Sequence, residues 1–428
     1  MPRSLHICLF LLFVWESLHA AEPSQRPNIV LILGDDIGFE CLNCYGGTSY
    51  KTPHLDALAA SGLKFDHCHS QPLCTPTRVQ IMTGLYNQRN YIRFGILDPQ
   101  ATTFAHLLKQ AGYKTCIAGK WQLEGGLDGP NKFGFDEYCL WQVNRRPARY
   151  PNPGLEINGR QVDYTDGQYG PDLVSDYLCD FIARHQDAPF FAYYPMILPH
   201  SPFVPTPDSD DWDPTVLGPE RGQGKNKYFT DMVCYTDKMV GKVVARLDEL
   251  GLRDNTLVIF TGDNGTNQKI TSRLGDREYP GGKGKTSDNG THVALLASWP
   301  KVIRPGRTCD DLIDFTDVLP TLVEVGGATL PDGIPFDGAS FAPQLRGESG
   351  TPREWIYCWY ERDGKRNKVS RHARDKQYKL YADGRYFDVV ADPLEEQTLG
   401  QTLAPEAADR RAKLQAVLDR MRVESDPS

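Results

Sequence analysis

Short apolar runs alternate with amphipathic stretches along most of the chain. The runs at 28–33 and 256–261 have the sequences NIVLIL and TLVIFT, a pattern typical of strands that are buried on both faces. Similar runs at 114–118 and 190–194 predict two further strands. Because helical patterns separate these runs, we expect an α/β fold with a large, mostly parallel sheet sandwiched by helices.

The covering helices are predicted from apolar residues that recur every three or four positions. The longest such stretch is 229–250, and Gly251 follows it. Shorter stretches at 52–60, 103–111 and 172–185 predict three more helices. The Pro-, Asp- and Gly-rich stretch at 202–227 is expected to be a long loop.

The pattern changes after about Gly347. The segments 355–360 and 378–390 have the pattern of antiparallel strands, and 404–423 has that of a charged helix. The chain is therefore expected to divide into an α/β domain at 21–347, which holds the functional site, and a smaller C-terminal subdomain of antiparallel strands and a terminal helix at 348–428.

The first residues have the composition of a secretory signal peptide. Arg3 precedes the apolar stretch 7–14, and small residues follow around Ala20. The stretch is too short to span a bilayer, and an uncleaved anchor is the alternative. We expect residues 1–20 to be removed and the mature chain to be secreted or periplasmic, or lumenal in a eukaryote, with no membrane attachment.

Composition narrows the classes of function. Of 428 residues, 40% are hydrophobic and 24% charged, an ordinary globular balance. A net charge of -8 gives no overall attraction to nucleic acid or acidic membrane, which excludes a protein that coats polyanions. The 11 cysteines are too scattered for a disulfide-built scaffold, and Cys41 and Cys44 lack a second pair to complete a zinc site.

Carboxylates follow two of the predicted strands. Asp35 and Asp36 come after the first apolar run, and Asp263 and Asn264 come after the last. Ligands gather at the carboxyl ends of parallel strands, and adjacent carboxylates repel each other unless a cation neutralises them. Hard oxygen donors suit calcium or magnesium and not zinc, whereas helix capping and a plain turn are the structural alternatives.

A cysteine precedes another predicted helix. Pro76 suits a first helical turn, so Cys74 lies where backbone amides favour an anion, with Arg78 about one turn further on. The pattern indicates an anion site with a reactive residue. An acidic thiol and an ordinary structural cysteine are the alternatives.

The pentapeptide at 74–78 resembles the C-x-P-x-R signature of the sulfatase family, which belongs to the alkaline-phosphatase-like superfamily. Further blocks resemble the other motifs of this family in the same order, over a range from about 28 to about 399. These blocks lie at 34–36, 119–121, 199–202, 262–265, 282–284 and 374–396.

The resemblance implies a hydrolase of sulfate monoesters that depends on a modified residue and a metal. It implies that a formylglycine-generating enzyme oxidises Cys74 to formylglycine during maturation. It also implies calcium, in preference to magnesium, as the bound ion. The implied ligands are the modified residue 74, Asp35, Asp36, Asp263 and Asn264.

In the implied mechanism the hydrated aldehyde attacks sulfur and later expels sulfate. Arg78, Lys120 and Lys283 would neutralise the sulfate oxygens, with Lys285 as an alternative to Lys283. His200 or Lys283 would protonate the leaving oxygen.

Two positions depart from the family pattern. Gln122 stands where the family has a histidine after Lys-Trp, and glutamine cannot accept a proton near neutral pH. His292 follows the Gly-Lys-Gly block in an unusual context. We hypothesise that His292 supplies the missing imidazole or contacts substrate, with a structural loop histidine as the alternative. Gln122 and His292 are thus candidate substrate-binding residues.

A sulfated carbohydrate is the expected substrate, and no nucleic-acid partner is expected. The segments 141–150, with three arginines, and 202–227 are candidate saccharide-binding segments. A phosphonate monoester or phosphodiester hydrolase of the same superfamily is one alternative. A non-catalytic binding protein, with Cys74 unmodified, is another.

Overall fold

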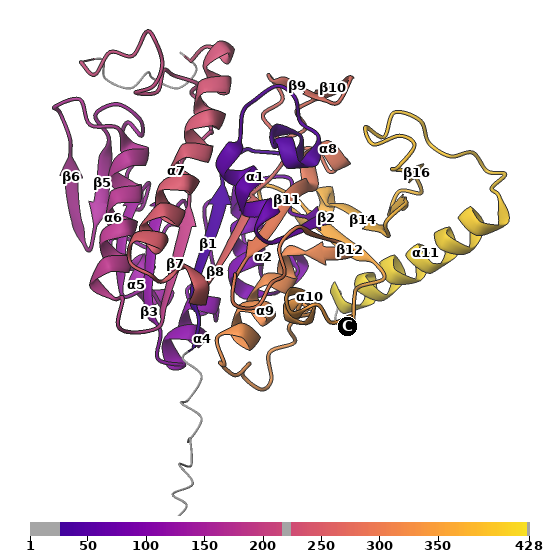
Figure 1. Cartoon of the computed structure of the whole chain (residues 1–428). Coiled ribbons are helices and arrows are strands. Elements are labelled where there is room, and N and C mark those ends of the chain that lie inside the picture. Colours follow the sequence, from indigo (N-terminus) through magenta and orange to yellow (C-terminus); the bar gives the residue numbers. More distant parts are fainter. Residues whose placement is uncertain (1–25, 216–223, 426–428) are drawn as a thin grey trace, which may run out of the picture.

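A ten-stranded mixed sheet runs through the computed structural model, which describes residues 26–215 and 224–425 (Figure 1). The predicted signal segment, 1–20, lies outside the described residues. In sheet order the strands are β12 (Arg307–Asp314), β2 (Leu63–His69), β11 (His292–Ser298), β8 (Thr256–Gly262), β1 (Asn28–Gly34), β7 (Phe190–Pro195), β3 (Lys114–Lys120), β4 (Glu137–Trp141), β5 (Gly154–Ile157) and β6 (Arg160–Asp163).

Most of this sheet is parallel, as predicted. β1 lies between β7 and β8 and pairs in parallel with both, so Leu31 is opposite Tyr193 and Ile259. β11 and β5 run against the other strands of the sheet. The four predicted strands are β1, β3, β7 and β8, and together they occupy the centre of the sheet.

Helices cover both faces of the sheet. Alternate residues of β1 therefore belong to two different hydrophobic cores, one on each face. Leu31 and its neighbours at 29 and 33 belong to one core, and Val30 and Ile32 belong to the other. The first core includes residues of α2 (Cys74–Thr83), α4 (Phe104–Gln110) and α9 (Val318–Val325). The second includes residues of α1 (Pro53–Ala60), α6 (Gly170–Arg184) and α7 (Phe229–Glu249).

The C-terminal part has its own four-stranded antiparallel sheet and a terminal helix, at the right of Figure 1. The segment 378–390 forms two antiparallel strands joined by a tight turn, as predicted. Leu414 and Met421 of the helix contribute to the first core. The elements are β13 (Ile356–Tyr360), β14 (Ser370–Arg374), β15 (Tyr378–Tyr381), β16 (Tyr386–Asp388) and α11 (Pro405–Ser425).

Shorter elements complete the chain. No helix in the described parts combines the length and apolarity needed to cross a membrane. Most of the described part of the predicted loop 202–227 lacks regular structure, and a short 3-10 turn at Asn226–Tyr228 ends it. The remaining short elements are α3 (Asn87–Asn90), α5 (Gly129–Lys132), α8 (Asp288–Thr291), α10 (Ala342–Arg346) and the hairpin β9 (Thr271–Leu274) with β10 (Arg277–Pro280).

Truncation of Leu31 tests the central packing. Leu31 is fully buried in the middle of β1, so Leu31→Ala should lower the free energy of unfolding by about 2–5 kcal/mol. Leu330→Ala is the matched control, because Leu330 is 36% exposed, and its cost should be within about 0.5 kcal/mol. Urea unfolding measures both, and equal costs would contradict the central position of Leu31.

Candidate functional site

Three carboxylates converge where β1 and β8 end side by side. Gly34 pairs with Gly262, so Asp35 and Asp36 emerge next to Asp263. The Asp263 amide donates to the Gly34 carbonyl at 2.8 Å, and the Asp36 amide donates to Asp263 Oδ1 at 2.9 Å. All three carboxylates are fully buried. Such a cluster is stable only if positive charge balances it.

Lys120 and Arg78 balance two of these carboxylates. Lys120 is the last residue of β3, and its Nζ donates to both oxygens of Asp35 at 2.8 Å. Burial raises the pKa of Asp35, but the nearby positive charges of Lys120, Arg78 and Lys283 act together against burial and hold that pKa well below its usual range. Arg78, in the second turn of α2, contacts Asp263 at 3.4 Å. Burial and the charge of Asp35 raise the pKa of Asp263 to about 8.

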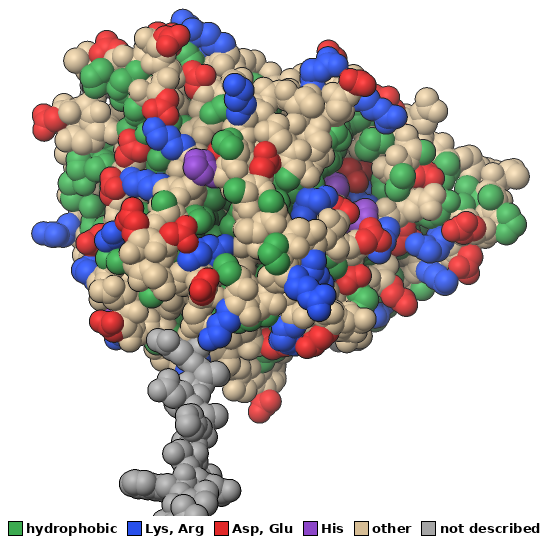
Figure 2. Space-filling model, in the orientation of Figure 1, with side chains coloured by type: hydrophobic (Ala, Val, Ile, Leu, Met, Phe, Trp, Pro, Cys, Tyr) green, Lys and Arg blue, Asp and Glu red, His purple; other side chains and the backbone are tan. Residues whose placement is uncertain are grey.

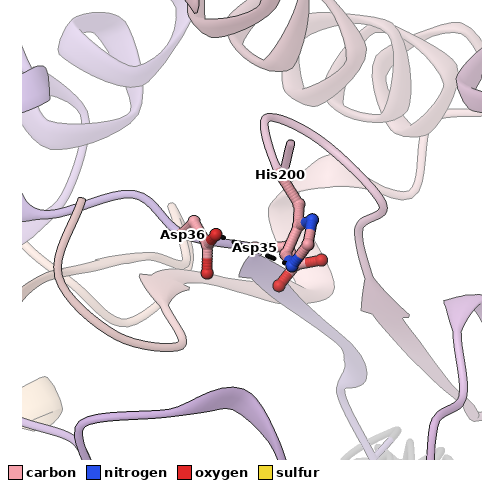
Figure 3. Close-up of side chains that lie close together, drawn as sticks. All are labelled: Asp35, Asp36 and His200. Atoms are coloured by element: carbon pink, nitrogen blue, oxygen red, sulfur yellow. Dashed lines mark ion pairs between the residues drawn. The ribbon is translucent and has the colours of Figure 1, made fainter. Parts of the chain in front are cut away.

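Asp36 receives its contacts from other parts of the chain. Lys283 Nζ lies 2.6 Å from Asp36 Oδ2, and His200 Nε2 lies 3.7 Å from the same oxygen. Figure 3 shows the His200 ring directed toward Asp36. Burial and the charge of Lys283 lower the pKa of His200 well below its ordinary value, so its imidazole is neutral. Asp36 itself has a left-handed backbone, with a φ of 67°.

The side chains of this cluster provide oxygen atoms of the kind that bind a hard cation such as calcium or magnesium. Asn264 donates its Nδ2 hydrogen to Asp36 Oδ1 at 2.9 Å, but its Oδ1 is buried and has no hydrogen-bond partner. Ligand atoms of Asp35, Cys74 and Asp263 lie within 4.8 Å of one another. A buried acceptor without a donor beside clustered carboxylates fits a metal ion with oxygen ligands.

Cys74 is the first residue of α2 and is 2% exposed. Burial raises the pKa of its thiol even though Lys120 and Lys283 act in the opposite direction. Desolvation therefore acts against an acidic thiol at this helix N-terminus. Arg78 donates to the Lys120 carbonyl at 2.9 Å, and its buried Nε has no partner.

These residues open into a cavity of about 1650 Å³. Its lining includes Cys74, Gln122, His200, Lys283 and the whole segment 141–150. Gln122 has a φ of 57°, and its buried Oε1 has no hydrogen-bond partner. Of the predicted site residues, Cys74, Gln122, His200 and Lys283 line this cavity, and Lys285 does not.

An arginine packs on a tryptophan in the cavity wall. The guanidinium of Arg149 lies 3.8 Å from the Trp141 ring centroid, and its NH1 lies 3.0 Å from His200 Nδ1. Lys269 and Arg362 also line the cavity. They were not predicted as site residues, because each comes from a distant part of the chain that carries no recognisable motif.

This local concentration of cations does not extend over the face of the molecule drawn in Figure 2. Figure 2 shows Lys and Arg side chains interspersed with Asp and Glu over the face drawn. The overall charge of -8 likewise includes no excess of positive charge.

His292 is not brought to this cavity, which corrects the hypothesis that it replaces the imidazole missing at Gln122. It lines a separate pocket of about 370 Å³ next to the C-terminal subdomain. Its ring stacks on Phe39 and His69 at 4.2 and 4.8 Å, and its Nε2 lies 2.9 Å from the Asp66 carbonyl. Burial lowers its pKa to about 4, as for a structural histidine.

Among the described residues, neither the CxxC pair nor any other cysteine forms a disulfide. All cysteines in the described parts of the chain, including Cys41 and Cys44, have free thiols. Cys41 and Cys44 are therefore isolated thiols.

Comparisons with known proteins agree with this geometry. The family model Sulfatase matches residues 27–328, and the model N-sulphoglucosamine sulphohydrolase, C-terminal, matches residues 283–424. Arylsulfatase A of Homo sapiens is 32% identical over 438 residues, covering 92% of this chain and 81% of the relative. N-acetylgalactosamine-6-O-sulfatase of Bacteroides thetaiotaomicron is 29% identical over 417 residues, covering 78% and 79%.

A solved structure has the same fold. The crystal structure of Ps i-CgsB in complex with k-i-k-neocarrahexaose has a TM-score of 0.76 and 25% identity to this chain. The match covers 94% of this chain and 93% of the other.

Removal of Lys120 tests the charge balance of the cluster. In the presence of a chelator, Lys120→Met should lower the free energy of unfolding by about 3–5 kcal/mol, because it leaves Asp35 buried and unpaired. Lys238→Met is the matched control, since Lys238 pairs with Asp208 at the surface, and it should cost at most about 1 kcal/mol. Both losses are measured by urea unfolding. Similar losses of unfolding free energy for the two variants would contradict the role of Lys120 in neutralising Asp35.

Proposed function

This chain belongs to the sulfatase family and is a sulfuric ester hydrolase, and from this premise we propose that it desulfates a carbohydrate with calcium and a formylglycine made from Cys74. The observation that carries the proposal is the convergence of Cys74 and three cations on buried carboxylates at one large cavity. The cations are Arg78, Lys120 and Lys283.

The buried acidic cluster is the proposed calcium site. Asp35, Asp36 and Asp263 would hold the ion together with the unpartnered Oδ1 of Asn264. Their oxygen atoms are the donors that calcium prefers, and magnesium is the alternative ion. Bound calcium would supply positive charge that neutralises the carboxylates and orients the side chain of residue 74.

Residue 74 is the proposed nucleophile after oxidation by a formylglycine-generating enzyme. The Sγ of Cys74 occupies the position where formylglycine would present its oxygens. A hydrated aldehyde supplies one hydroxyl for attack on sulfur and a second for release of sulfate. The start of α2 holds this residue rigidly, because every residue of α2 is buried.

The three cations are proposed to bind the sulfate oxygens and to stabilise the charge that develops on them. Arg78 has a buried Nε without a partner, so it can donate to an oxygen anion with no bond to break. Lys283 stays protonated, because Asp36 raises its pKa against the effect of burial. Lys120 remains tied to Asp35 and contributes its charge from there.

Proton transfer is assigned to His200 and Lys283. His200 is the histidine among the described residues that line the cavity, and its ring can hydrogen-bond to the leaving oxygen. Lys283 carries a proton that it can donate to the leaving oxygen. Gln122 lines the same cavity with an unpartnered acceptor, so we assign it to hydrogen bonding with substrate or with residue 74.

A carbohydrate is the proposed substrate, because the cavity is large and combines an aromatic wall with cations. Segment 141–150 provides Trp141 and three arginines, of which Arg149 stacks on the tryptophan. The names of the relatives support the same class, since one acts on an N-acetylgalactosamine sulfate. A phosphonate monoester or phosphodiester hydrolase, and a binding protein with unmodified Cys74, are the alternatives.

We also propose that the chain is exported, with 1–20 as its signal and a secreted, periplasmic or lumenal destination. The proposed units are the catalytic domain at 21–347 and the C-terminal subdomain at 348–428. The family models support two parts, although their matches overlap at 283–328.

Activity and modification of Cys74 test the proposed function. Protein from its native host should contain formylglycine at position 74, detected by mass spectrometry of the peptide. Cys74→Ala should lower kcat/KM for a sulfated sugar by at least about a thousandfold, because the nucleophile is lost. Cys234→Ala is the matched control and should retain activity, since Cys234 lies on α7 and outside the cavity lining.

The same protein preparation distinguishes the proposed sulfatase from the two alternative functions. Sulfated sugars, aryl sulfates and phosphonate monoesters are assayed in parallel at equal concentrations. Faster hydrolysis of the phosphonates would favour the related hydrolase, and an intact thiol in fully native protein without turnover would favour the binding protein.

Calcium binding tests the metal site independently of turnover. Calcium at about 100 times its Kd should stabilise the chelated protein by about 2.7 kcal/mol, seen as a rise in Tm. Asn264→Ala should weaken calcium binding at least about tenfold, because it removes the unpartnered oxygen. Asn267→Ala, which changes another amide at the cavity, should bind calcium normally. Equal calcium affinities for the two variants would rule out Asn264 as a ligand.

A further inference from the structure

Lys283 lies on a glycine-rich loop that is held in its conformation by contacts with other parts of the chain. The loop 281–287 joins β10 to α8. On its first half, the Lys283 amide donates to the Thr266 carbonyl at 3.0 Å, and the Gly284 amide donates to the Pro72 carbonyl at 2.8 Å. Gly284 has a φ of 84°, a conformation that glycine adopts without strain. Because glycine also permits many other conformations, this sequence does not hold Lys283 in place by itself.

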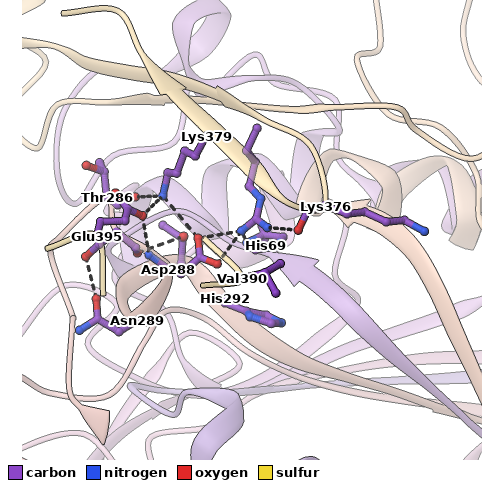
Figure 4. Close-up of polar contacts among 12 residues, drawn as sticks. His69, Thr286, Asp288, Asn289, His292, Lys376, Lys379, Val390 and Glu395 are labelled. Carbon is purple, nitrogen blue, oxygen red and sulfur yellow. Dashed lines mark hydrogen bonds and ion pairs between the residues drawn. The ribbon is translucent and has the colours of Figure 1, made fainter. Parts of the chain in front are cut away.

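The second half of the loop is held by the C-terminal sheet. Lys379, on β15, is completely buried, and its Nζ donates to the Thr286 carbonyl at 2.5 Å. The same Nζ lies 2.7 Å from Glu395 Oε1 (Figure 4). Tyr381 in turn donates to Glu395 Oε2 at 2.6 Å, which fixes the carboxylate.

Arg374 fixes the point where the loop becomes α8. Its NH1 lies 2.7 Å from both oxygens of Asp288, the first residue of α8. The Asp288 amide donates to Glu395 Oε1 at 3.1 Å, so the carboxylate that binds Lys379 also caps this helix. Arg374 is 2% exposed and Asp288 is 5% exposed.

These four residues form a buried cluster of two cations and two anions: Arg374, Lys379, Asp288 and Glu395. Burial of ion pairs gives little net stability, and the best-supported use of such pairs is to specify one arrangement. We propose that this cluster positions Lys283 for catalysis by fixing the loop 281–287 from the C-terminal side. The assignment rests on the proposed role of Lys283 at the sulfate group.

The geometry explains why the loop must be fixed at both ends. Lys283 reaches Asp36 with a separation of 2.6 Å while it also lines the cavity. A lysine side chain is long and flexible, so the position of its ammonium depends on where its backbone is held. A displacement of about 1 Å at a catalytic group can cost about a hundredfold in rate. The cluster is therefore a positioning device, because none of its four members lines the catalytic cavity.

A double-mutant cycle tests the positioning role. Lys379→Met combined with Glu395→Gln removes one cation and one anion together, so no unpaired charge is left buried. With a small sulfate ester, kcat should fall about tenfold and KM should change less than about threefold, because the lost interaction acts in the transition state. In the Lys283→Ala background the same two changes should lower kcat less than about twofold. A full tenfold loss in that background would overturn the proposal.

Arg410→Met is the control for damage to the C-terminal subdomain as a whole. Arg410, on α11, pairs with Asp375 at 2.7 Å, outside the loop 281–287. It should lower Tm while kcat stays within about twofold of the unmodified protein. If Arg410→Met lowers kcat as much as the Lys379 and Glu395 changes do, general weakening of the subdomain explains the loss and the proposal is wrong.

Hydrogen exchange tests the positioning of the loop 281–287 independently of the proposed sulfatase activity. Without substrate, amides of 282–288 should exchange at least about tenfold faster in the Lys379→Met, Glu395→Gln protein, and amides of β1 should not change. This measurement needs no turnover. Absence of sulfatase activity in the unmodified protein would overturn the proposed function, whereas unchanged exchange in the loop would overturn the positioning role.

Discussion

The structure around the site depends on the neutralisation of three carboxylates that are buried at the carboxyl ends of β1 and β8. A buried carboxylate is costly unless a cation or hydrogen-bond donor compensates it. Asp35, Asp36 and Asp263 obtain this compensation from Lys120, Lys283 and Arg78. Since the three cations come from β3, from a loop and from α2, this one requirement fixes the relative positions of elements that are distant in sequence.

The central strands were predictable because their burial leaves a local signal. β1 and β8 are buried along their whole length, so they have continuous apolar runs. β2 was missed because polar residues such as Lys64 and Asp66 interrupt its apolar positions, and β12 was missed because it is a charged strand at the sheet edge. Strand order was not predictable, since it follows from pairings between distant segments that no local pattern encodes.

The site was predictable where side chains follow directly from strand ends, as for Asp35 and Asp263. The prediction failed for His292, because this residue begins β11 directly after α8 and its ring stacks with Phe39 and His69. The sequence also left the pKa of the Cys74 thiol open. A helix N-terminus lowers a thiol pKa, but local sequence does not indicate how deeply the sulfur is buried, and here burial dominates.

Charge counting links the two clusters to the binding of an anion by an acidic protein. The site has three carboxylates and three cations, so with all six ionised it is neutral, and two positive charges from the proposed calcium would leave it attractive to a sulfate ester. The second cluster, with two charges of each sign, is also neutral and adds no field of its own. The loop 281–287 joins the clusters, because it carries Lys283 and leads to Asp288. The C-terminal sheet can therefore hold the loop without weakening the positive potential on which anion binding depends.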